Sequence, residues 1–596
     1  MKPLSASRMT AAGIAADVQA GRRSAESVAR DALARIEAYD AVQAHAWIER
    51  PAAEAVVARA RAVDARIAAG ETLPLAGVPY AVKDNIDVAG LPTTAACPAF
   101  AYTPANSAEV VARLDAAGAV MMGKTNLDQF ATGLVGARSP YGAPGCVFNR
   151  AYVSGGSSSG SGVAVAAGLV AFALGTDTAG SGRVPAAFNN LIGLKPTKGR
   201  WSTTGLVPAC RSLDCITVFA GDLDGATLVD GVVAGFDAAD SFSRRVPETT
   251  ATIPAAFRFG VPRLEQQVFL GDARAEALYR AAIARLEAAG GRAVEVDIDP
   301  LLAAAQMLYA GPWVAERTAA AESLLKANPA AIEPTVRAIL QGGPAFSAVD
   351  AFKGLYEMQA YARVAEQMWQ AIDVLLLPTT PTTYRIAEVK AEPVALNANL
   401  GRYTNFVNLL DMSALAVPAG FRENGTGVGV TLIGPAFADA ALIDLARRYL
   451  EIAPMPDAPP LDREGRPETV KLAVVGAHLA GMPLHWQLTS REARLVARTR
   501  TAPVYKLYAM ANSTPPKPAL VHTGEGGAID VEVYELPVSA FGSFVVEVPA
   551  PLAIGTVTLE DGSQVKGFVA EPRALDGAED ITALGGWRAY IARATA

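Results

Sequence analysis

Apolar residues in roughly the first 450 positions recur with two spacings, one typical of helices and one typical of short buried strands. After Ser24 they recur every three to four positions, so we expect a helix that Ser24 caps. Further helices are expected at 107–117, 282–289 and 315–326, and strands at 119–122 and 374–377. The longest apolar run, at 163–174, predicts a buried helix. This alternation of helices and strands predicts an α/β fold.

The pattern changes after a proline-rich, polar segment at 453–467, which we interpret as a linker. Short strand-like runs follow, at 472–475, 504–510, 529–536, 544–548 and 555–559. Asp561 and Gly562, just after the last run, predict a hairpin turn. The chain is therefore expected to contain a large domain at 1–455, a linker at 456–470 and a smaller β-rich domain at 471–596.

The composition excludes several classes of function. The 596 residues carry a modest net charge of −7 with no block of basic residues, which argues against a nucleic-acid partner. The four cysteines are scattered, which argues against a disulfide framework or a zinc site and fits a reducing compartment. We see no apolar segment of a secretion signal near the start, and the run at 163–174 is too short to span a membrane. We expect a cytoplasmic protein without a membrane partner.

Two loops rich in glycine and serine, 155–162 and 175–183, carry the candidate chemistry. The usual base for a serine nucleophile is histidine, and the chain has only His45, His478, His485 and His522. Lys83 is the candidate base instead, because its apolar neighbours predict a buried strand and burial lowers the pKa of a lysine. Neutral Lys83 can take a proton from Ser157 while Ser157 takes one from Ser181, which attacks a carbonyl. The alternative is that both loops are flexible turns and Lys83 is a surface charge.

Two further motif matches in this region are misleading. Segment 118–125 matches the phosphate-binding pattern GxxxxGK[ST], but the predicted order here is helix, glycine, strand, and a working loop needs the strand first. Segment 156–160 matches the GxSxG elbow of α/β-hydrolases, yet that fold needs a later histidine in the same domain, and none follows before His478. We interpret both matches as accidental. A nucleotide-binding protein stays the non-hydrolase alternative.

The two loops together resemble the signature of the amidase signature family. In that family a lysine precedes a GGSS loop and the nucleophilic serine lies downstream; here 24 residues separate Ser157 from Ser181. The resemblance implies Lys83 as base, Ser157 as a bridging serine in a cis peptide, Ser181 as nucleophile, and a mixed central sheet flanked by helices. It also implies an oxyanion hole formed by Thr178, Ala179, Gly180 and Ser181, with Arg183 as a structural residue beside it. Gly182 replaces a common aliphatic residue, and we expect it to widen the pocket.

A closer resemblance, to the allophanate hydrolase family, is carried by segments 123–142 and 175–199 and by the extra C-terminal domain. It implies hydrolysis of allophanate, the product of a biotin-dependent urea carboxylase, to ammonia and carbon dioxide without a metal or organic cofactor. Tyr309 and Arg317 match the family's substrate-recognition positions, and Gly133 matches a backbone contact. A carboxylate in the substrate predicts such an arginine, although Arg317 also fits a surface ion pair with a neighbouring acid. Since family members are commonly dimers, a homodimer is expected.

The resemblance extends to the C-terminal domain, which in that family is an α+β domain similar to γ-glutamyl cyclotransferase. There it promotes decarboxylation of the N-carboxycarbamate that the amidase domain leaves. His478 and His485 are the candidates for this step, and Lys506 and His522 are further possibilities. The alternative is that the histidines are structural and the domain is an oligomerisation module.

Two other enzymes stay possible. One is an amidase-signature enzyme for another small carboxylate-bearing amide, such as malonamate. The second is a transamidation subunit, which the fused C-terminal domain argues against.

Overall fold

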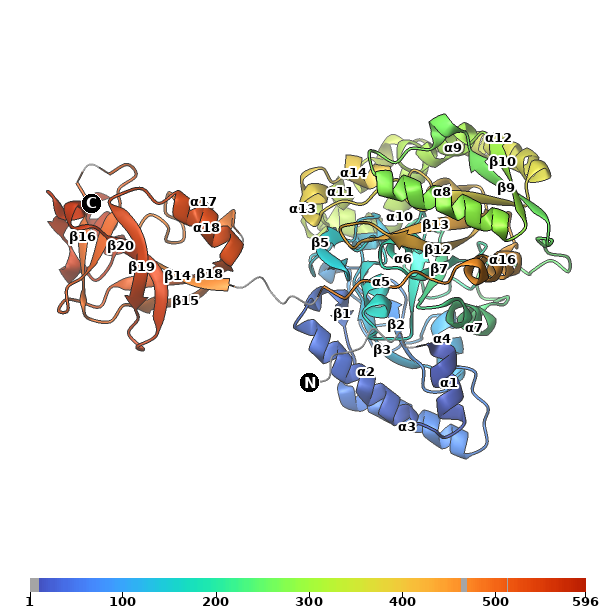
Figure 1. Cartoon of the computed structure of the whole chain (residues 1–596), viewed down its shortest axis with the longest axis horizontal. Coiled ribbons are helices and arrows are strands. Elements are labelled where there is room, and N and C mark those ends of the chain that lie inside the picture. Colours follow the sequence, from blue (N-terminus) through green and yellow to red (C-terminus); the bar gives the residue numbers. More distant parts are fainter. Residues whose placement is uncertain (1–9, 463–468, 492, 512, 596) are drawn as a thin grey trace. The chain divides into compact units, whose positions relative to one another are not determined.

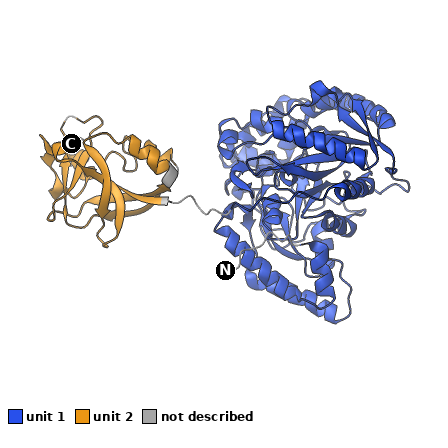
Figure 2. Ribbon diagram, in the orientation of Figure 1, with its two compact units in different colours: residues 1–462 blue, residues 463–596 orange. Residues whose placement is uncertain are grey.

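The computed structural model describes residues 10–462, 469–491, 493–511 and 513–595. The chain divides into two compact units, residues 1–462 and 463–596 (Figure 2). Within the predicted linker at 456–470, residues 456–462 form neither helix nor strand, and residues 463–468 lie outside the described residues.

The larger unit is built on an eleven-stranded mixed sheet (Figure 1). In spatial order its strands are β1 (Trp47–Glu49), β3 (Val120–Thr125), β2 (Pro79–Lys83), β6 (Phe172–Asp177), β8 (Cys215–Ala220), β7 (Ile192–Lys195), β12 (Ser413–Phe421), β13 (Gly427–Gly434), β11 (Val374–Pro378), β9 (Phe257–Pro262) and β10 (Gly291–Val296). Strand β2 runs parallel to both β3 and β6, and β9 runs parallel to β10 and β11; the other neighbours are antiparallel. A separate ribbon pairs β4 (Gly145–Cys146) with β5 (Asn149–Val153).

Helices surround this sheet. They are α1 (Ala11–Gln19), α2 (Ala25–Asp40), α3 (Ala53–Ala68), α4 (Glu109–Ala116), α5 (Ser159–Ala166), α6 (Val184–Phe188), α7 (Leu223–Val233), α8 (Ala273–Ala288), α9 (Asp299–Ala310), α10 (Trp313–Ala327), α11 (Pro334–Gln341), α12 (Ala348–Ala371), α13 (Ile386–Ala391), α14 (Ala395–Leu400), α15 (Phe406–Leu409) and α16 (Asp439–Ile452). Helix α5 is almost wholly buried, because its serine, glycine, alanine and valine side chains are small enough for close packing on every side.

Strand β11 shows how the sheet separates two cores. Val374 and Leu376 pack into one core together with α8 and α16, whereas Leu375 and Leu377 pack into a second core with α9 and α12. Successive side chains of a strand point to opposite faces, so a run of buried apolar residues indicates that both faces are covered. The predicted α/β fold, with a mixed sheet flanked by helices, is confirmed.

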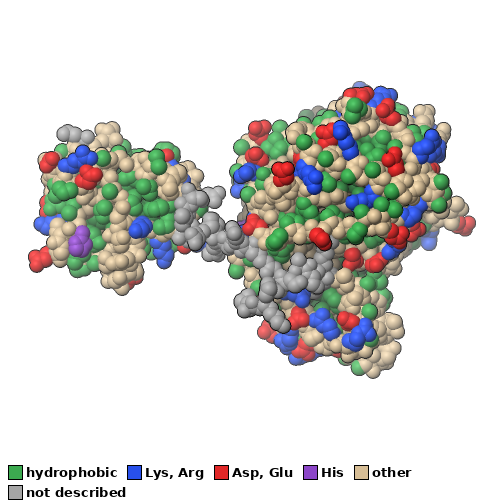
Figure 3. Space-filling view, viewed as in Figure 1, with side chains coloured by type: hydrophobic (Ala, Val, Ile, Leu, Met, Phe, Trp, Pro, Cys, Tyr) green, Lys and Arg blue, Asp and Glu red, His purple; other side chains and the backbone are tan. Residues whose placement is uncertain are grey.

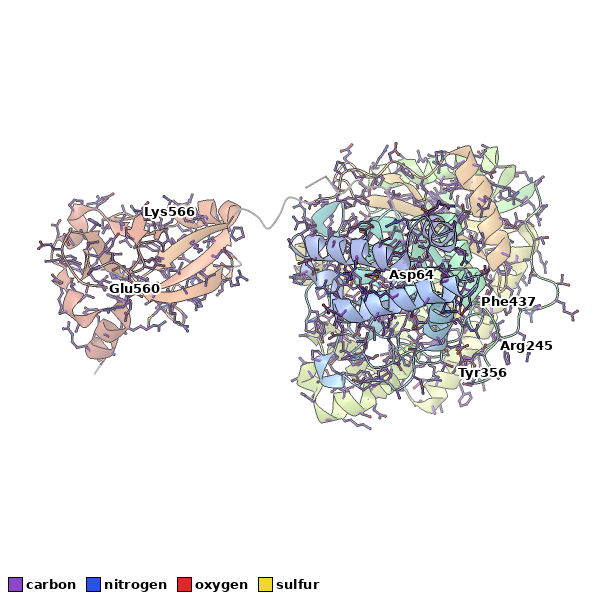
Figure 4. The ribbon with its side chains drawn as sticks, turned by 90° about the horizontal axis from the view of Figure 1, so that it is seen from below. Asp64, Arg245, Tyr356, Phe437, Glu560 and Lys566 are labelled. Atoms are coloured by element: carbon purple, nitrogen blue, oxygen red, sulfur yellow. The ribbon has the colours of Figure 1, made fainter. Side chains whose placement is uncertain are left out.

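Helix α2 is capped by Ser24 as expected. The Ser24 hydroxyl accepts a hydrogen bond from the Ser27 N–H (3.0 Å) at the start of α2. Asp64 of α3, labelled in Figure 4, accepts from the backbone N–H of Ala25 (2.6 Å) and Glu26 (3.1 Å). A carboxylate at a helix N-terminus satisfies free N–H groups and interacts favourably with the helix dipole. These contacts hold α2 against α3.

The smaller unit contains two sheets around its own apolar core. One sheet has the order β15 (Arg494–Arg500), β18 (Asp530–Pro537), β14 (Thr469–Val474), β20 (Gln564–Ala570) and β19 (Leu552–Thr558). The other has the order β17 (Pro518–His522), β16 (Tyr505–Ala509) and β21 (Glu579–Asp580). The helices are α17 (Trp486–Thr489), α18 (Val538–Val546) and α19 (Trp587–Thr595). The predicted hairpin at Asp561 and Gly562 joins β19 to β20. This unit is the expected β-rich domain.

Two sequence-based predictions were wrong. The apolar run at 163–174 is not one helix: α5 ends at Ala166, Gly168 adopts a left-handed conformation (φ 71°), and β6 begins at Phe172. Glycine at this position ends the helix because it has no Cβ penalty there. The strand predicted at 544–548 lies largely within α18, where Phe544 is buried but Val546 is 86% exposed. The run is short and mostly apolar, so its spacing did not distinguish a strand from a helix with one buried face.

Surface and composition agree with the expectation of a globular chain. Lys, Arg, Asp and Glu side chains intermingle on the face shown in Figure 3. All four cysteines are buried and free. Among the described residues, no helix is both long and apolar enough to cross a bilayer.

Candidate active site

Lys83 is the last residue of β2 and lies in the interior of the larger unit. Its Nζ is 2.7 Å from the Ser157 Oγ and 2.7 Å from the Thr176 Oγ1. Strand β2 pairs in parallel with β6, which places Lys83 beside the carboxyl end of β6, where Thr176 and Asp177 lie. The carboxyl ends of parallel strands are where α/β folds commonly bind ligands. The predicted alternative, a surface charge, is wrong, since Lys83 is fully buried.

Burial gives Lys83 the protonation behaviour of a base. Loss of solvation lowers its pKa to about 7, against the opposing influence of the carboxylates of Asp128, Asp214 and Asp177. A neutral amine has two N–H bonds and one lone pair. Lys83 can therefore donate to the Thr176 hydroxyl and accept the proton of Ser157 at the same time.

Ser157 is held at the entry to α5 by its backbone. The Gly156–Ser157 peptide bond is cis. The Ser157 carbonyl accepts from the N–H groups of Asp128 (3.0 Å) and Ser159 (2.9 Å), and the Gly156 N–H donates to the Leu134 carbonyl (2.8 Å). These bonds leave the Ser157 hydroxyl directed at Lys83.

Ser181 lies on the loop after β6, and Asp177 organises that loop. The Asp177 carboxylate accepts from the N–H groups of Gly180 (2.7 Å) and Gly182 (3.0 Å) and forms a bidentate ion pair with Arg183, with both N···O distances 2.9 Å. Burial alone raises the pKa of Asp177, but the Arg183 charge and the N–H donors bring it below its ordinary value. The loop around Ser181 is thus wrapped around one ionised carboxylate.

The predicted oxyanion hole differs from the structure at one position. The Gly180 N–H already donates to Asp177, while the N–H groups of Thr178, Ala179 and Ser181 make no bond to other described residues. The Thr178 side chain is fixed as well, since its hydroxyl donates to the carboxylate of buried Asp214. The donors that remain for an oxyanion are those of Thr178, Ala179 and Ser181.

Gly182 does not widen the pocket as expected. A Cβ at this position would lie 2.8 Å from the side chain of Thr217 on β8. The missing side chain therefore lets the loop pack closely on the sheet. The space beside Gly182 is filled by Thr217 and not open to a ligand.

Arg317 of α10 is buried, only 2% exposed. Its Nη1 donates to the Thr132 hydroxyl (3.1 Å), and its guanidinium carbon lies 5.0 Å from the ring centre of Tyr309. Its Nε is buried without a hydrogen-bond partner, and no carboxylate of the described residues forms an ion pair with it. The predicted alternative, a surface ion pair, is therefore wrong: the neighbouring acid, Glu316, instead accepts from Ser212. Gly133, the predicted backbone contact, is the next residue after Thr132 and therefore lies near Arg317.

An open cavity of about 690 Å³ reaches Tyr309 from the surface, between α9, α11 and α14. We refer to it as the Tyr309 cleft. Its other lining residues are Arg138, Leu302, Ala305, Gln306, Ala310, Val314, Ala338, Ile339, Gly342, Phe346, Val394, Asn397, Ala398, Asn399, Gly401, Arg402 and Asn405. Lys83, Ser157 and Ser181 are not among them.

The two misleading motifs have structural roles. Lys124, the lysine of the GxxxxGK[ST] match, ends in a buried ion pair with Asp84 (3.2 Å) and donates to the Thr93 hydroxyl (3.0 Å). Its segment follows α4 and forms β3, as expected, so no loop is open to phosphates. Ser158, the serine of the GxSxG match, is buried and donates to the Thr176 carbonyl (3.1 Å).

Comparison with known proteins fits this geometry. The amidase family model matches residues 27–443, and the model of the allophanate hydrolase C-terminal domain matches residues 470–592. The chain belongs to the amidase family. It is therefore an amidohydrolase that acts on a carbon–nitrogen bond, and it carries a second domain of the allophanate hydrolase type.

Similar proteins share both domains or the first alone. The Kluyveromyces lactis allophanate hydrolase structure is 44% identical, with a TM-score of 0.69, and the match covers 96% of this chain and 97% of that one. A urea amidolyase of Lachancea kluyveri is 48% identical over 87% of this chain, which spans only 30% of that relative's length. A glutamyl-tRNA(Gln) amidotransferase subunit of Cyanothece is 35% identical, covering 74% of this chain and 96% of the relative. The predicted resemblance to the allophanate hydrolase family is confirmed.

His478 of the smaller unit lines a cavity of about 240 Å³. Its ring stacks on Phe568 (centroids 5.0 Å apart) and its Nε2 is 2.7 Å from the Gln487 Oε1. Burial lowers the pKa of His478, so its ring is neutral near neutral pH. Lys517 lines the same cavity and supplies a positive charge there.

The other candidates of the smaller unit lie elsewhere. His485 Nε2 is 3.0 Å from the hydroxyl of Tyr534, which donates to the carboxylate of Glu532 (3.1 Å). Lys506 is 3.8 Å from Asp580 on the surface, and His522 is exposed at the end of β17. None of the three lines the cavity of His478.

Several residues of the site were not singled out from the sequence. Asp177, Asp214 and Asp128 are buried carboxylates that hold the loops around the serines. Asp177 lies inside the 175–183 motif, so a search for buried partners of Arg183 would have found it. Asp214 and Lys517 are far from any motif, and only the folded chain brings them to their sites.

Proposed function

We propose that the larger unit hydrolyses allophanate, H₂N–CO–NH–COO⁻, at its terminal amide. The observation that carries this is Arg317, a buried cation without an ion-pair partner among the described residues. The charges of Asp214 and Glu316 act on Arg317 from a distance, but neither forms an ion pair with it, so the guanidinium can still bind a carboxylate through two parallel hydrogen bonds. The ring of Tyr309 lies over the guanidinium and closes one side.

The first chemical step uses Lys83, Ser157 and Ser181 as a relay. Neutral Lys83 takes the proton of Ser157, Ser157 takes that of Ser181, and the Ser181 oxygen attacks the carbonyl carbon of the terminal amide. The oxyanion accepts from the free N–H groups of the loop that carries Ser181. The proton returns through Ser157 to the leaving nitrogen, and ammonia departs as the carbon–nitrogen bond breaks.

The second step reverses these roles with water. The acyl group on Ser181 is attacked by water, whose proton passes through Ser157 to Lys83. The Ser181–acyl bond breaks, Ser181 regains the proton from Lys83 through Ser157, and the new carboxylic acid releases its own proton to solvent. The product is N-carboxycarbamate, ⁻OOC–NH–COO⁻.

We further propose that the smaller unit promotes decarboxylation of this dianion in the cavity of His478 and Lys517. The nitrogen–carboxylate bond breaks, carbon dioxide leaves, and the nitrogen takes a proton to give carbamate, which then yields ammonia and carbon dioxide. The positive Lys517 offsets the dianion's charge, water supplies the proton that the nitrogen takes, and the neutral His478 ring lines the same cavity as a polar group.

The same geometry also fits another small amide with a carboxylate at a similar distance, such as malonamate. In that case the smaller unit is a non-catalytic oligomerisation module. We also expect the protein to act after a urea carboxylase, which would supply its allophanate. We expect it to be cytoplasmic and to form a homodimer.

The decisive experiment compares allophanate with biuret, in which a neutral amide replaces the carboxylate. Wild-type protein should release ammonia from allophanate with far higher kcat/KM than from biuret. Arg317→Ala should lower kcat/KM for allophanate by about 100-fold or more, corresponding to about 3 kcal/mol for a lost buried charged contact, with little effect on biuret. Equal losses on both substrates would show that Arg317 is structural.

The role of the smaller unit is tested by stoichiometry. Wild-type protein should release two ammonia molecules per allophanate, and His478→Ala in the full chain should release the first at an unchanged rate and the second more slowly. Arg498→Ala, on the exposed edge of the same unit, is the matched control. An unchanged second release in His478→Ala would favour the oligomerisation module.

A further inference from the structure

The Tyr309 cleft carries positive charge without a carboxylate in its wall. Among its described lining residues, Arg138 and Arg402 are positively charged and none is Asp or Glu. The rest of the wall is largely apolar, including Leu302, Val314, Ile339, Phe346 and Val394. Apolar walls weaken dielectric screening, so the field of a charge reaches farther inside a cleft than on an open surface.

Neither arginine forms an ion pair with a carboxylate of the described residues. Arg138 donates from Nη1 to the Thr132 carbonyl (3.0 Å), and its Nε is buried without a partner. The carboxylate of buried Asp128, which accepts from the Arg138 backbone N–H (2.9 Å), offsets part of the Arg138 charge. Arg402 lies with its guanidinium carbon 5.7 Å from the ring centre of Tyr403, and its Nε is also buried without a partner. Arg402 is therefore the more available cation for an anion in the cleft.

Residues that are bonded to the cleft lining, or next to it in sequence, also contact residues of the reaction site. Thr132 is held from both sides, its carbonyl by Arg138 and its hydroxyl by Arg317. At the other edge, Thr404 lies between the lining residues Arg402 and Asn405 and packs on Gly180: a Cβ there would lie 2.5 Å from the Thr404 Oγ1. The cleft therefore leads toward Arg317, which lies over the ring of its lining residue Tyr309, and toward the Ser181 loop, where Gly180 packs on Thr404.

We propose that the Tyr309 cleft is the entrance for anionic substrate and that Arg402 is a specificity-determining residue that draws carboxylates into it. This inference rests on the proposed function, since it assumes a substrate with a carboxylate. Arg402 attracts the anion during approach, and Arg317 binds it in the reaction geometry. Arg402 does not touch the reacting atoms and therefore acts on kcat/KM and not on kcat.

The test compares Arg402→Gln with Arg402→Lys at low and high salt. The control is Arg59→Gln, an equal loss of charge on exposed α3, which lies at the opposite end of the larger unit from α9, α11 and α14 in Figure 1. At low salt, Arg402→Gln should lower kcat/KM for allophanate about 3- to 10-fold with kcat unchanged, and the loss should shrink below about 2-fold near 0.5 M NaCl. Arg402→Lys should keep most of the wild-type value, and Arg59→Gln should change nothing.

Three results would overturn the inference. A loss in Arg402→Gln that salt does not reduce would mean that the side chain acts by shape. If Arg402→Lys lost as much kcat/KM as Arg402→Gln, the side chain would again act by shape. If Arg59→Gln lost as much, the effect would come from the net charge of the protein. If Arg402→Gln does not fold by circular dichroism, Arg402→Lys and the salt dependence of wild-type kcat/KM carry the test. A salt-independent wild-type value then refutes it.

The design separates this inference from the proposed function. Wild-type protein without activity on allophanate would refute the proposed function first. The cleft is then tested with malonate, a dicarboxylate that offers no amide to cleave, by calorimetric titration of wild-type protein and Arg402→Gln. Weaker binding to the variant at low salt, lost at high salt, would uphold the anion entrance; equal binding would overturn it.

Discussion

Lys83→Met is the substitution that examines the site most directly. Methionine keeps the length of the side chain and removes the ionisable amine. The Lys83 pKa of about 7 against an ordinary value of 10.5 means that burial disfavours the ammonium by about 5 kcal/mol, at 1.36 kcal/mol per pKa unit. The variant should therefore lose activity without losing stability, which is an unusual combination for a fully buried residue.

The sign of the pH effect follows from the two pKa values. Below about pH 7 Lys83 is protonated in both the folded and the unfolded chain, and the folded state bears the full cost of a buried ammonium. Between about pH 7 and 10.5 only the unfolded chain keeps the proton, so the wild-type free energy of unfolding rises with pH relative to that of Lys83→Met. From pH 7.5 to 9.5 this gain is about 2–3 kcal/mol. The hydrogen bonds to Ser157 and Thr176 that methionine cannot make add a constant offset and cancel in the comparison.

Two assays measure these effects. Denaturant unfolding of both proteins at pH 7.5 and 9.5, followed through the transition of the larger unit, gives the change in the stability difference. The rate of ammonia release should fall about 10²- to 10⁴-fold in Lys83→Met. The wild-type kcat/KM should rise with pH, with a midpoint at about pH 7 where Lys83 loses its proton. A stability difference that does not change with pH, or a flat activity profile from pH 6 to 8.5, would refute the assignment of Lys83 as a buried neutral base.

Three further substitutions have expected outcomes. Ser181→Ala should abolish ammonia release while circular dichroism and the melting temperature stay unchanged, and substantial residual turnover would remove Ser181 from the nucleophile role. Asp177→Asn should lower the free energy of unfolding by about 3–5 kcal/mol, because it leaves the buried Arg183 without its carboxylate. The double variant Asp177→Asn/Arg183→Met, which removes both charges, should recover part of that loss. Gly160→Ala should destabilise the larger unit by about 1–3 kcal/mol or more. The added Cβ would lie 2.2 Å from the Ala46 carbonyl oxygen and 2.6 Å from the Asn126 backbone nitrogen. An unchanged free energy of unfolding would show that α5 can shift to make room.

The fold was largely predictable because its signals are local. The cap at Ser24, the helix at α4, the strands at β3 and β11 and the hairpin at Asp561 all follow from spacing and turn residues within a few positions. The failures occurred where periodicity carries little information. The run at 163–174 is almost wholly apolar, and the predicted run at 544–548 was too short to distinguish a strand from one side of a helix.

The candidate site was predictable only in part. Lys83, Ser157 and Ser181 could be proposed from the sequence because the glycine-rich loops around the serines are distinctive. The bonding state of each group was not predictable: Gly180 was expected to serve the oxyanion hole, but its N–H is used by Asp177. Arg317 was ambiguous in the sequence, because an arginine on an alanine-rich helix is usually solvated.

The sequence by itself determined the serine-rich loops, the lysine that precedes them and the two-part organisation of the chain, because each depends on residue types within a short window. Only the tertiary structure decided that Lys83 is buried beside Ser157, that Arg317 has no ion-pair partner among the described residues, and that Arg402 lines a cleft without carboxylates. The physical reason is that a pKa and the affinity of a charge for a ligand depend on solvation and on neighbours within a few ångströms. Those neighbours come from segments far apart in the chain.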